Sequence, residues 1–272
     1  MSTEYEYDEN GNLTKDLNKN ITAIQYNCLN LPSRVMFANG NSISYLYDAA
    51  GRKLRTVHFL EGDSVTTDYC GNVVYENGVP QILLTEVGYV SLTDGKYHYY
   101  LKDHQGNNRV VVDEEGTVEE VNHYYPFGGV FSSTGDAQPY KYNGKELDRK
   151  GGLDWYDYGA RMYDAALGRF MKTDRFSEKY VSLSPYQYGA NNPVNNIDVN
   201  GDSLLLNKTS VAEAMLAIYN GLEDGTNLKM KFNNGVLDPT SIEAHAKVTS
   251  DFFLQDLYEI ATNEKMVELS VS

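Results

Sequence analysis

The stretch from Tyr140 to Asp202 reads YKYNGKELDRKGGLDWYDYGARMYDAALGRFMKTDRFSEKYVSLSPYQYGANNPVNNIDVNGD. Pairs of aromatic residues, Gly and Asn turn points, and closely spaced Arg and Asp residues follow one another along it. Glycines let backbones approach closely, and aromatic rings can fill the gaps that remain. The stretch therefore predicts a packed plug. Its structural residues are expected to be Trp155, Tyr156, Arg161, Tyr163, Arg169, Phe170 and Gly201.

A short helix is predicted inside this stretch, from Asp164 to Leu167, because Asp164 can cap its start and Gly168 can end it. Three arginines lie among aspartates here, and the favoured interpretation of these charges is a network of ion pairs beneath the plug. Its members would be Arg161, Arg169 and Arg175 with Asp154, Asp157, Asp164 and Asp174.

Upstream of the plug, one layout of alternating aromatics, Tyr followed by Asp or Asn, a turn and an apolar strand occurs three times. The copies are EYEYDENGNLT at 4–14, IQYNCLNLPSRV at 24–35 and SYLYDAAGRKLRTV at 44–57. The spacing is 19, 21 and 22 residues between the tyrosines Tyr7, Tyr26, Tyr47 and Tyr69. Such a period accommodates two strands and two turns, so we predict a series of antiparallel hairpins.

Each repeat contains its own turn signal. Asp8 and Asp48 can accept hydrogen bonds from nearby backbone amides, and Gly11 and Gly51 supply the positive φ of a tight return. Further strands are predicted on either side of HQGN and DEEG, up to about residue 131. The PFGG segment is predicted to interrupt the sheet, because Pro126 cannot donate to a strand ladder and its glycines permit a bend.

The segments GARMYDAALGRFMKTD and SPYQYGANNPVNNIDVNG resemble the RHS repeat-associated core, which closes RHS/YD-repeat proteins at their C-terminal side. The Tyr-Asp units upstream are similar to the YD repeats of that family. The resemblance implies a mainly β fold, in which YD-repeat antiparallel hairpins form part of a spiralling shell with a closing core plug and a small α+β C-terminal segment. It implies three regions: YD-repeat hairpins at 1–135, the RHS repeat-associated core at 136–202, and a variable C-terminal segment at 203–272.

The leading functional prediction is a structural one, in which this chain is the terminal part of a polymorphic-toxin shell that closes the container and presents a variable payload. Family shells are built from many hundreds of residues, so we expect the chain to be a fragment that ends in a payload or in its first part. The resemblance further implies export or a cell-surface location, a cognate immunity protein, and self-association through exposed strand edges.

A second prediction is aspartate-dependent self-cleavage, because some members of the family cut themselves just beyond the core. The matching positions are Asp174 and Asp198, with Arg175 or Arg169 as the supporting arginine. Two carboxylates held close can divide the roles of acid and base. This sequence departs from the family pattern, since Val199 replaces a proline and Asp202 adds a negative charge. We therefore predict no efficient cleavage.

A third prediction is a surface carbohydrate-binding module, in which exposed tyrosines and Trp155 would stack on sugars. Composition narrows the alternatives. The net charge of -15 and the pI near 4.7 argue against binding to nucleic acid or anionic membranes. No apolar run is long enough for a membrane span, and the charged N-terminal sequence is no signal peptide.

The cysteines and histidines give no sign of a cofactor or metal site. Cys28 and Cys70 are too few for a disulfide framework, and His245 in the tail has no metal-ligand spacing around it. The tail instead predicts one helix at about 209–222, a strand, the turn NNG and another strand, and a second helix that begins at about 241 or at 251 and ends at 260.

Overall fold

The computed structural model describes residues 3–179, 182–202, 204–206, 232–233 and 236–237. The chain forms two compact units, the first from residues 1–194 with 198–203, and the second from residues 195–197 with 204–272. The first unit contains both the predicted repeats and the predicted plug.

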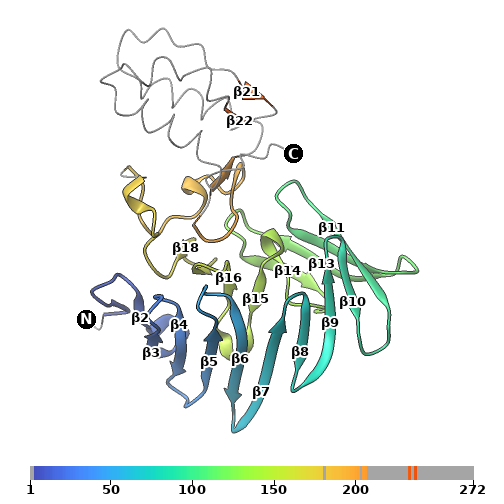
Figure 1. Ribbon diagram of the computed structural model, residues 1–272, viewed down its shortest axis with the longest axis horizontal. Helices are drawn as coiled ribbons and strands as arrows, with labels where there is room; N and C mark the ends of the chain where they lie inside the picture. Colours follow the sequence, from blue (N-terminus) through green and yellow to red (C-terminus); the bar gives the residue numbers. More distant parts are fainter. Residues whose placement is uncertain (1–2, 180–181, 203, 207–231, 234–235, 238–272) are drawn as a thin grey trace. The chain divides into compact units, whose positions relative to one another are not determined.

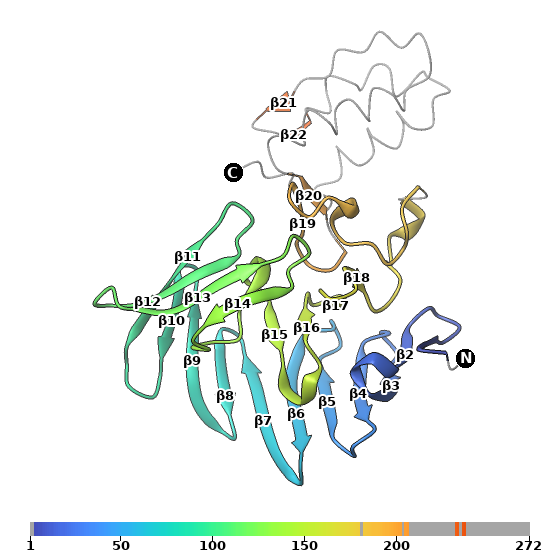
Figure 2. The same ribbon diagram turned by 180° about the vertical axis from the view of Figure 1, so that it is seen from behind.

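Strands β1 to β14 of the first unit form one antiparallel sheet, in which each strand pairs with the next strand in the sequence (Figures 1 and 2). This confirms the predicted series of hairpins. The strands are Tyr5–Tyr7 (β1), Leu13–Asp16 (β2), Ile21–Tyr26 (β3), Pro32–Phe37 (β4), Ser42–Tyr47 (β5), Lys53–Leu60 (β6), Asp63–Cys70 (β7), Val73–Glu76 (β8), Val79–Thr85 (β9), Gly88–Ser91 (β10), Tyr97–Lys102 (β11), Asn108–Asp113 (β12), Val118–Tyr124 (β13) and Val130–Thr134 (β14). Tyr7, Tyr26 and Tyr47 end β1, β3 and β5, so each repeat contributes two strands.

The turns of these hairpins share one hydrogen-bond pattern. The Asp8 carboxylate accepts from the backbone amides of Asn10, at 2.9 Å, and Asn12, at 2.8 Å. Gly11 has a φ of 75°, a conformation that side chains with a Cβ disfavour. The same carboxylate contacts recur at Asp48. A short polar motif is therefore enough to reverse the chain at each of these turns.

The PFGG segment does not interrupt the sheet. Gly128 donates its amide to the carbonyl of Tyr125, and Tyr125 donates to the carbonyl of Gly129, both at 2.8 Å. These bonds close a tight turn between β13 and β14. The prediction was wrong because Pro126 and its glycines lie in the turn, where no ladder bond is needed.

The plug contains a second antiparallel sheet of short strands, Glu146–Asp148 (β15), Trp155–Asp157 (β16), Met162–Asp164 (β17) and Arg169–Phe170 (β18). Single-turn 3-10 helices occur at Leu17–Lys19 (η1), Tyr142–Gly144 (η2), Lys150–Gly152 (η3), Ser177–Lys179 (η4) and Gly189–Asn191 (η5). Pairing aligns one row of side chains across the small sheet, Leu147, Tyr156, Tyr163 and Phe170. All four are buried and belong to one aromatic-rich cluster.

The helix predicted from Asp164 to Leu167 is absent from this well-described segment, which forms the turn between β17 and β18. The Asp164 carboxylate accepts from the amide of Ala166 at 2.8 Å, as a turn-forming aspartate does. Asp164 also pairs with Arg169 across the hairpin. Strand pairing on both sides outweighs a single helical turn, whose nucleation is costly.

The two faces of the small sheet pack against different parts of the large one. On one face, Trp155 and Met162 join Leu13, Val35 and Ile43 of the first strands. On the other face, the row of aromatic side chains packs against partly buried residues of the β13 and β14 region, among them Tyr124, Phe127 and Val130. The large sheet therefore curves around the plug, and the core lies between them.

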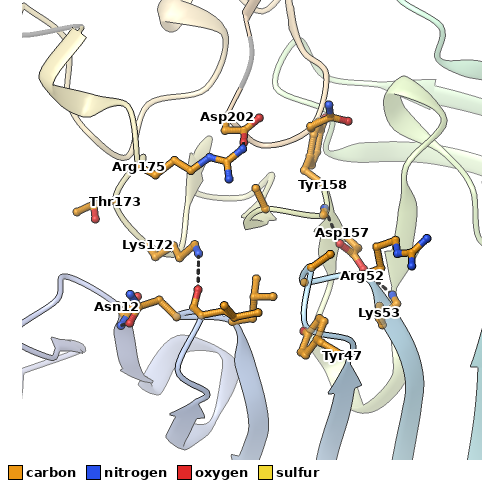
Figure 3. A pocket seen from close by; sticks show the side chains of 18 of the residues that line it. Asn12, Tyr47, Arg52, Lys53, Asp157, Tyr158, Lys172, Thr173, Arg175 and Asp202 are labelled. Atoms are coloured by element: carbon orange, nitrogen blue, oxygen red, sulfur yellow. Dashed lines mark hydrogen bonds and ion pairs between the residues drawn. The ribbon is translucent and has the colours of Figure 1, made fainter. Parts of the chain in front are cut away.

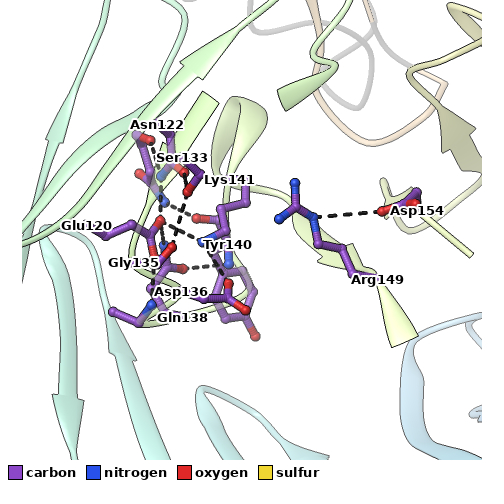
Figure 4. A network of polar contacts seen from close by, with 12 residues as sticks. Glu120, Asn122, Ser133, Gly135, Asp136, Gln138, Tyr140, Lys141, Arg149 and Asp154 are labelled. Atoms are coloured by element: carbon purple, nitrogen blue, oxygen red, sulfur yellow. Dashed lines mark hydrogen bonds and ion pairs between the residues drawn. The ribbon is translucent and has the colours of Figure 1, made fainter. Parts of the chain in front are cut away.

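A buried polar network fixes the connection between the two sheets (Figure 4). Glu120 of β13 is fully buried, and the Lys141 ammonium lies 2.6 Å from its carboxylate. The same carboxylate accepts from the backbone amide of Ala137 at 2.8 Å and from the side chain of Gln138 at 3.3 Å. A buried charge is tolerated only with such partners. The network therefore holds the segment between β14 and β15 on the inner face of the large sheet.

Asn196–Asp198 (β19) and Leu204–Leu206 (β20) form a two-stranded sheet, which belongs to the second unit except for Asp198. Phe232–Asn233 (β21) and Val236–Leu237 (β22) form the hairpin predicted around the NNG turn. The helices predicted at about 209–222 and 241–260 lie outside the described residues. Within the described residues, no helix has the length and apolar character needed to cross a membrane.

Candidate functional site

Arg161, directly before β17, brings the two predicted aspartates together. Its side chain is buried, and its Nη2 donates to Oδ2 of Asp174 at 2.8 Å and to Oδ2 of Asp198 at 3.3 Å. The sequence prediction had assigned the supporting role to Arg175 or Arg169. The structure corrects this, because the arginine between the two carboxylates is Arg161.

Local turns position both aspartates. Oδ1 of Asp174 accepts from the amide of Phe176 at 2.8 Å, and Oδ1 of Asp198 accepts from the amide of Gly201 at 2.6 Å. Each carboxylate thus uses one oxygen to close its own turn and the other to contact Arg161. The guanidinium can meet both aspartates because each turn leaves one oxygen facing it.

The backbone after Asp198 is also bound to this arginine. Nε of Arg161 donates to the carbonyl of Gly201, and Nη1 donates to the carbonyl of Pro185 at 3.1 Å. Gly201 has a φ of 80°, and a Cβ at this position would lie 2.9 Å from the backbone nitrogen of Arg161. Only glycine fits such a close approach without strain. The Gly201 backbone is therefore held directly against the plug.

Burial and nearby carboxylates act in opposite directions on the pKa of Arg161. Burial lowers the pKa of the Arg161 guanidinium below its ordinary value, while Asp174, Asp198 and Asp202 oppose that shift. A guanidinium remains protonated even so, since its ordinary pKa is far above neutrality. Its carbon also lies 3.8 Å from the centre of the Phe170 ring. The site is a buried cation shared by acidic side chains and backbone carbonyls.

The other two arginines of the predicted network have different partners. Arg175 forms an ion pair with Asp202, although the Arg175 side chain is 68% exposed. Arg169 lies 4.7 Å from the centre of the Tyr186 ring and donates to the Tyr7 hydroxyl at 2.7 Å. Arg169 therefore connects the plug to strand β1 and makes no contact of the predicted ion-pair kind among the described residues.

All three remaining aspartates of the predicted network pair with cations outside it, and Asp154 lies 3.8 Å from Nε of Arg149. Asp157 lies 2.6 Å from Nζ of Lys53, and Asp164 lies 3.2 Å from Nζ of Lys19. Both lysines belong to the first repeats, more than a hundred residues away in the sequence. The spacing of charged residues within the plug sequence does not predict these lysines, because the curved sheet brings them against the plug from a distant part of the chain.

Trp155 is only 1% exposed, and Tyr156, Tyr163 and Phe170 are equally buried. A buried indole cannot stack on a sugar, so Trp155 drops out of the carbohydrate-binding prediction, whereas exposed tyrosines such as Tyr97 and Tyr125 remain. Its partners in the core are those expected of a packed plug.

Three comparisons place the chain among known proteins. Residues 83–194 match the family model described as Teneurin YD-shell. Salivary gland surface protein 1 of Aedes aegypti is 29% identical over 249 residues, which cover 81% of this chain and 7% of that protein. The tRNA3(Ser)-specific nuclease WapA of Bacillus spizizenii is 27% identical over 244 residues, covering 79% of this chain and 10% of that protein.

The crystal structure of TcdB2-TccC3-Cdc42 has the same fold, with a TM-score of 0.59 and 20% identity over 78% of this chain. The match covers 11% of the chain in that structure. This chain thus spans about a tenth or less of the length of the proteins it resembles.

Proposed function

We propose that residues 136–202 of this RHS/YD-repeat chain close the end of a β-shell and present a variable C-terminal segment. The observation that carries this proposal is the position of the plug, whose two faces pack against early and late strands of the same curved sheet. Because the plug packs against both the early and the late strands, it fills the concave side of the sheet and can close the shell there.

Ionic contacts between sheet and plug support the closing role. Lys53 of β6 lies 2.7 Å from Glu146 and 2.6 Å from Asp157. Burial alone would lower the pKa of Lys53, but Asp157 and Glu146 outweigh it and hold this pKa well above its ordinary value. His58, also on β6, lies 2.8 Å from Asp148. These pairs attach β15 and β16 to the middle of the large sheet.

The segment from 203 to 272 is proposed to be a payload of the polymorphic-toxin type, or the first part of one. The Tyr-Asp layout ends before it, and the composition changes there. A relative named as a tRNA nuclease and a structural neighbour described as a Photorhabdus luminescens Tc holotoxin pore support this assignment. We further propose export or a cell-surface location, a bacterial role in competition between cells, and a small cognate immunity protein that binds the payload.

A protease-recognition sequence inserted after Ser203 would test the separation of shell and payload. Cleavage there should release the C-terminal segment, and the first unit should keep its melting temperature because the hydrophobic core of the described residues is built from positions up to Tyr188. A marked fall in the melting temperature after cleavage would mean that the C-terminal segment completes the shell core, and would contradict the proposal.

Self-cleavage is the second candidate function, because the Gly201 carbonyl and both aspartates contact the same arginine. A two-carboxylate mechanism requires one protonated acid and one base close to the scissile peptide. Here a guanidinium lies between the two groups, and Asp202 is already paired with Arg175. We propose that Arg161, Asp174 and Asp198 form a clamp that holds residues 198–202, and that the chain stays uncut.

A further inference from the structure

A cavity of about 600 Å³ lies between the turns of the first three repeats and the plug (Figure 3). Its wall includes Asn12, Asn30 and Tyr47 from the sheet and Lys172 and Thr173 from the plug. This volume falls within the roughly 300 to 1,000 Å³ of small-molecule sites. The space is therefore large enough for a ligand the size of a monosaccharide.

The cavity wall is locally basic in a chain whose net charge is -15. Its four cationic side chains, Arg52, Lys53, Lys172 and Arg175, face two acidic ones, Asp157 and Asp202. An excess of cations in an acidic protein concentrates positive potential at this one concave place.

Three of the four cations already have carboxylate partners. Arg52 pairs with Asp48 at 2.7 Å, Lys53 pairs with Asp157 at 2.6 Å, and Arg175 pairs with Asp202. Among the described residues, none forms an ion pair with Lys172.

The nearest acceptor found for the half-buried Lys172 ammonium is the carbonyl of Leu29, at 3.5 Å (Figure 3). Burial and the nearby Arg161 and Arg175 lower the pKa of Lys172 to about 8, and Asp202 and Asp174 oppose this shift only in part. The nearby carboxylates therefore compensate only part of the positive charge on Lys172. A bound anion would compensate the rest.

Uncharged polar side chains line the same cavity as this ammonium. Oδ1 of Asn30 accepts from the side chains of Asn10, at 3.2 Å, and Asn12, at 3.0 Å. These two bonds fix the orientation of the Asn30 amide and leave its NH2 group to donate elsewhere. This NH2 group can donate to a hydroxyl of a ligand.

We propose that this cavity binds a small hydroxylated ligand carrying one carboxylate or phosphate group, with Lys172 as the ion-pair partner of that group. Asn30 and Thr173 would contact the hydroxyls. The anionic group could come from an acidic sugar or from a phosphorylated one, since both present the same charge to Lys172. The proposal stands apart from payload release, because it depends only on the side chains that line this cavity.

Calorimetric titration of the complete chain at low salt tests the proposal with glucuronate, glucose 6-phosphate and neutral glucose. We expect saturable binding of at least one anionic sugar, with glucose bound about tenfold more weakly or worse, as loss of a charged hydrogen bond implies. Binding of glucuronate alone would identify a carboxylate ligand, and binding of glucose 6-phosphate alone would identify a phosphate ligand. Absence of saturable binding by both anions would overturn the proposal.

Three variants sharpen the test. Lys172→Gln should weaken anion binding about tenfold or more, whereas Lys96→Gln, which makes the same charge change at an exposed site, should leave it unaltered. Affinity should fall as the pH rises through about 8 in the parent, because Lys172 loses its proton there. Lys172→Arg should retain binding at pH 9.5, since a guanidinium stays protonated. Equal weakening in both Gln variants, or pH-independent binding by the parent, would contradict the assignment.

Discussion

The large sheet and the plug are stabilised in different ways, although both are antiparallel β-structure. Every strand of the sheet pairs with its neighbour in the sequence, and turn motifs such as that at Asp8 are complete within five residues. The plug has strands of only two or three residues, and its contacts reach residues more than a hundred positions away. The sheet therefore depends on many small local contributions, and the plug on a few large distant ones.

The largest expected effect is that of Arg161→Met in the plug. This change leaves two buried carboxylates without their cation and removes donors to two carbonyls. Breaking a buried ion pair costs about 3 to 5 kcal/mol of the free energy of unfolding. Because two carboxylates lose their partner here, we expect a loss of about 5 kcal/mol. Urea unfolding measures the loss. Arg52→Met, which removes an exposed ion pair from a sheet turn, serves as the control and should melt like the parent.

Trp155→Ala should rank next. Truncating a fully buried Trp costs about 3 to 5 kcal/mol. We expect a loss of about 4 kcal/mol here, because removing the indole would leave a void between the plug and the sheet. Tyr97→Ala removes a half-exposed ring from β11 and should cost far less. If the two variants unfold at the same urea concentration, the distinction between plug and sheet is wrong.

Asp198→Asn should have an intermediate effect. The amide can still accept from Gly201, but it loses the charge that pairs with Arg161, for an expected cost of about 2 kcal/mol. Mass spectrometry should find both parent and variant at the intact mass near 30.6 kDa. A parent fragment beginning close to Ser203, absent from the variant, would show that the pair cleaves the chain and does not merely clamp it.

The smallest effect is expected for Asp8→Ala in the first sheet turn. It removes one carboxylate that accepts two backbone amides, but Gly11 and strand pairing still favour the turn. We expect a loss of about 1 kcal/mol in thermal unfolding. A loss as large as that of Arg161→Met would mean that the sheet, like the plug, depends on single residues.

The same difference explains how much could be predicted from the sequence. Hairpin repeats follow from the tyrosine spacing and from turn motifs, because the partners of each strand are its neighbours. The role of Arg161 could not be predicted over Arg169 or Arg175, since all three lie near aspartates in the sequence. The local pattern after Asp164 predicts a helix because it contains no sign of the strand partners that make this segment a turn.

The pairing of Lys19 with Asp164, and of Lys53 with Asp157, has no sequence signal of its own. Both depend on the curvature that brings the first repeats against the plug. Self-association through the sheet edges β1 and β14 remains a prediction, which light scattering of the purified chain can test.

The sequential order of strands also determines what can happen while the protein is being synthesised. When β1 to β6 have emerged from the ribosome, all pairing partners of β1 to β5 are already present. Only β6 still lacks a partner, which is β7. Arg161 has to wait until Asp198 and Gly201 have emerged. Translation would therefore build the sheet one hairpin at a time, and the clamp would assemble only when the last residues of the plug leave the exit tunnel.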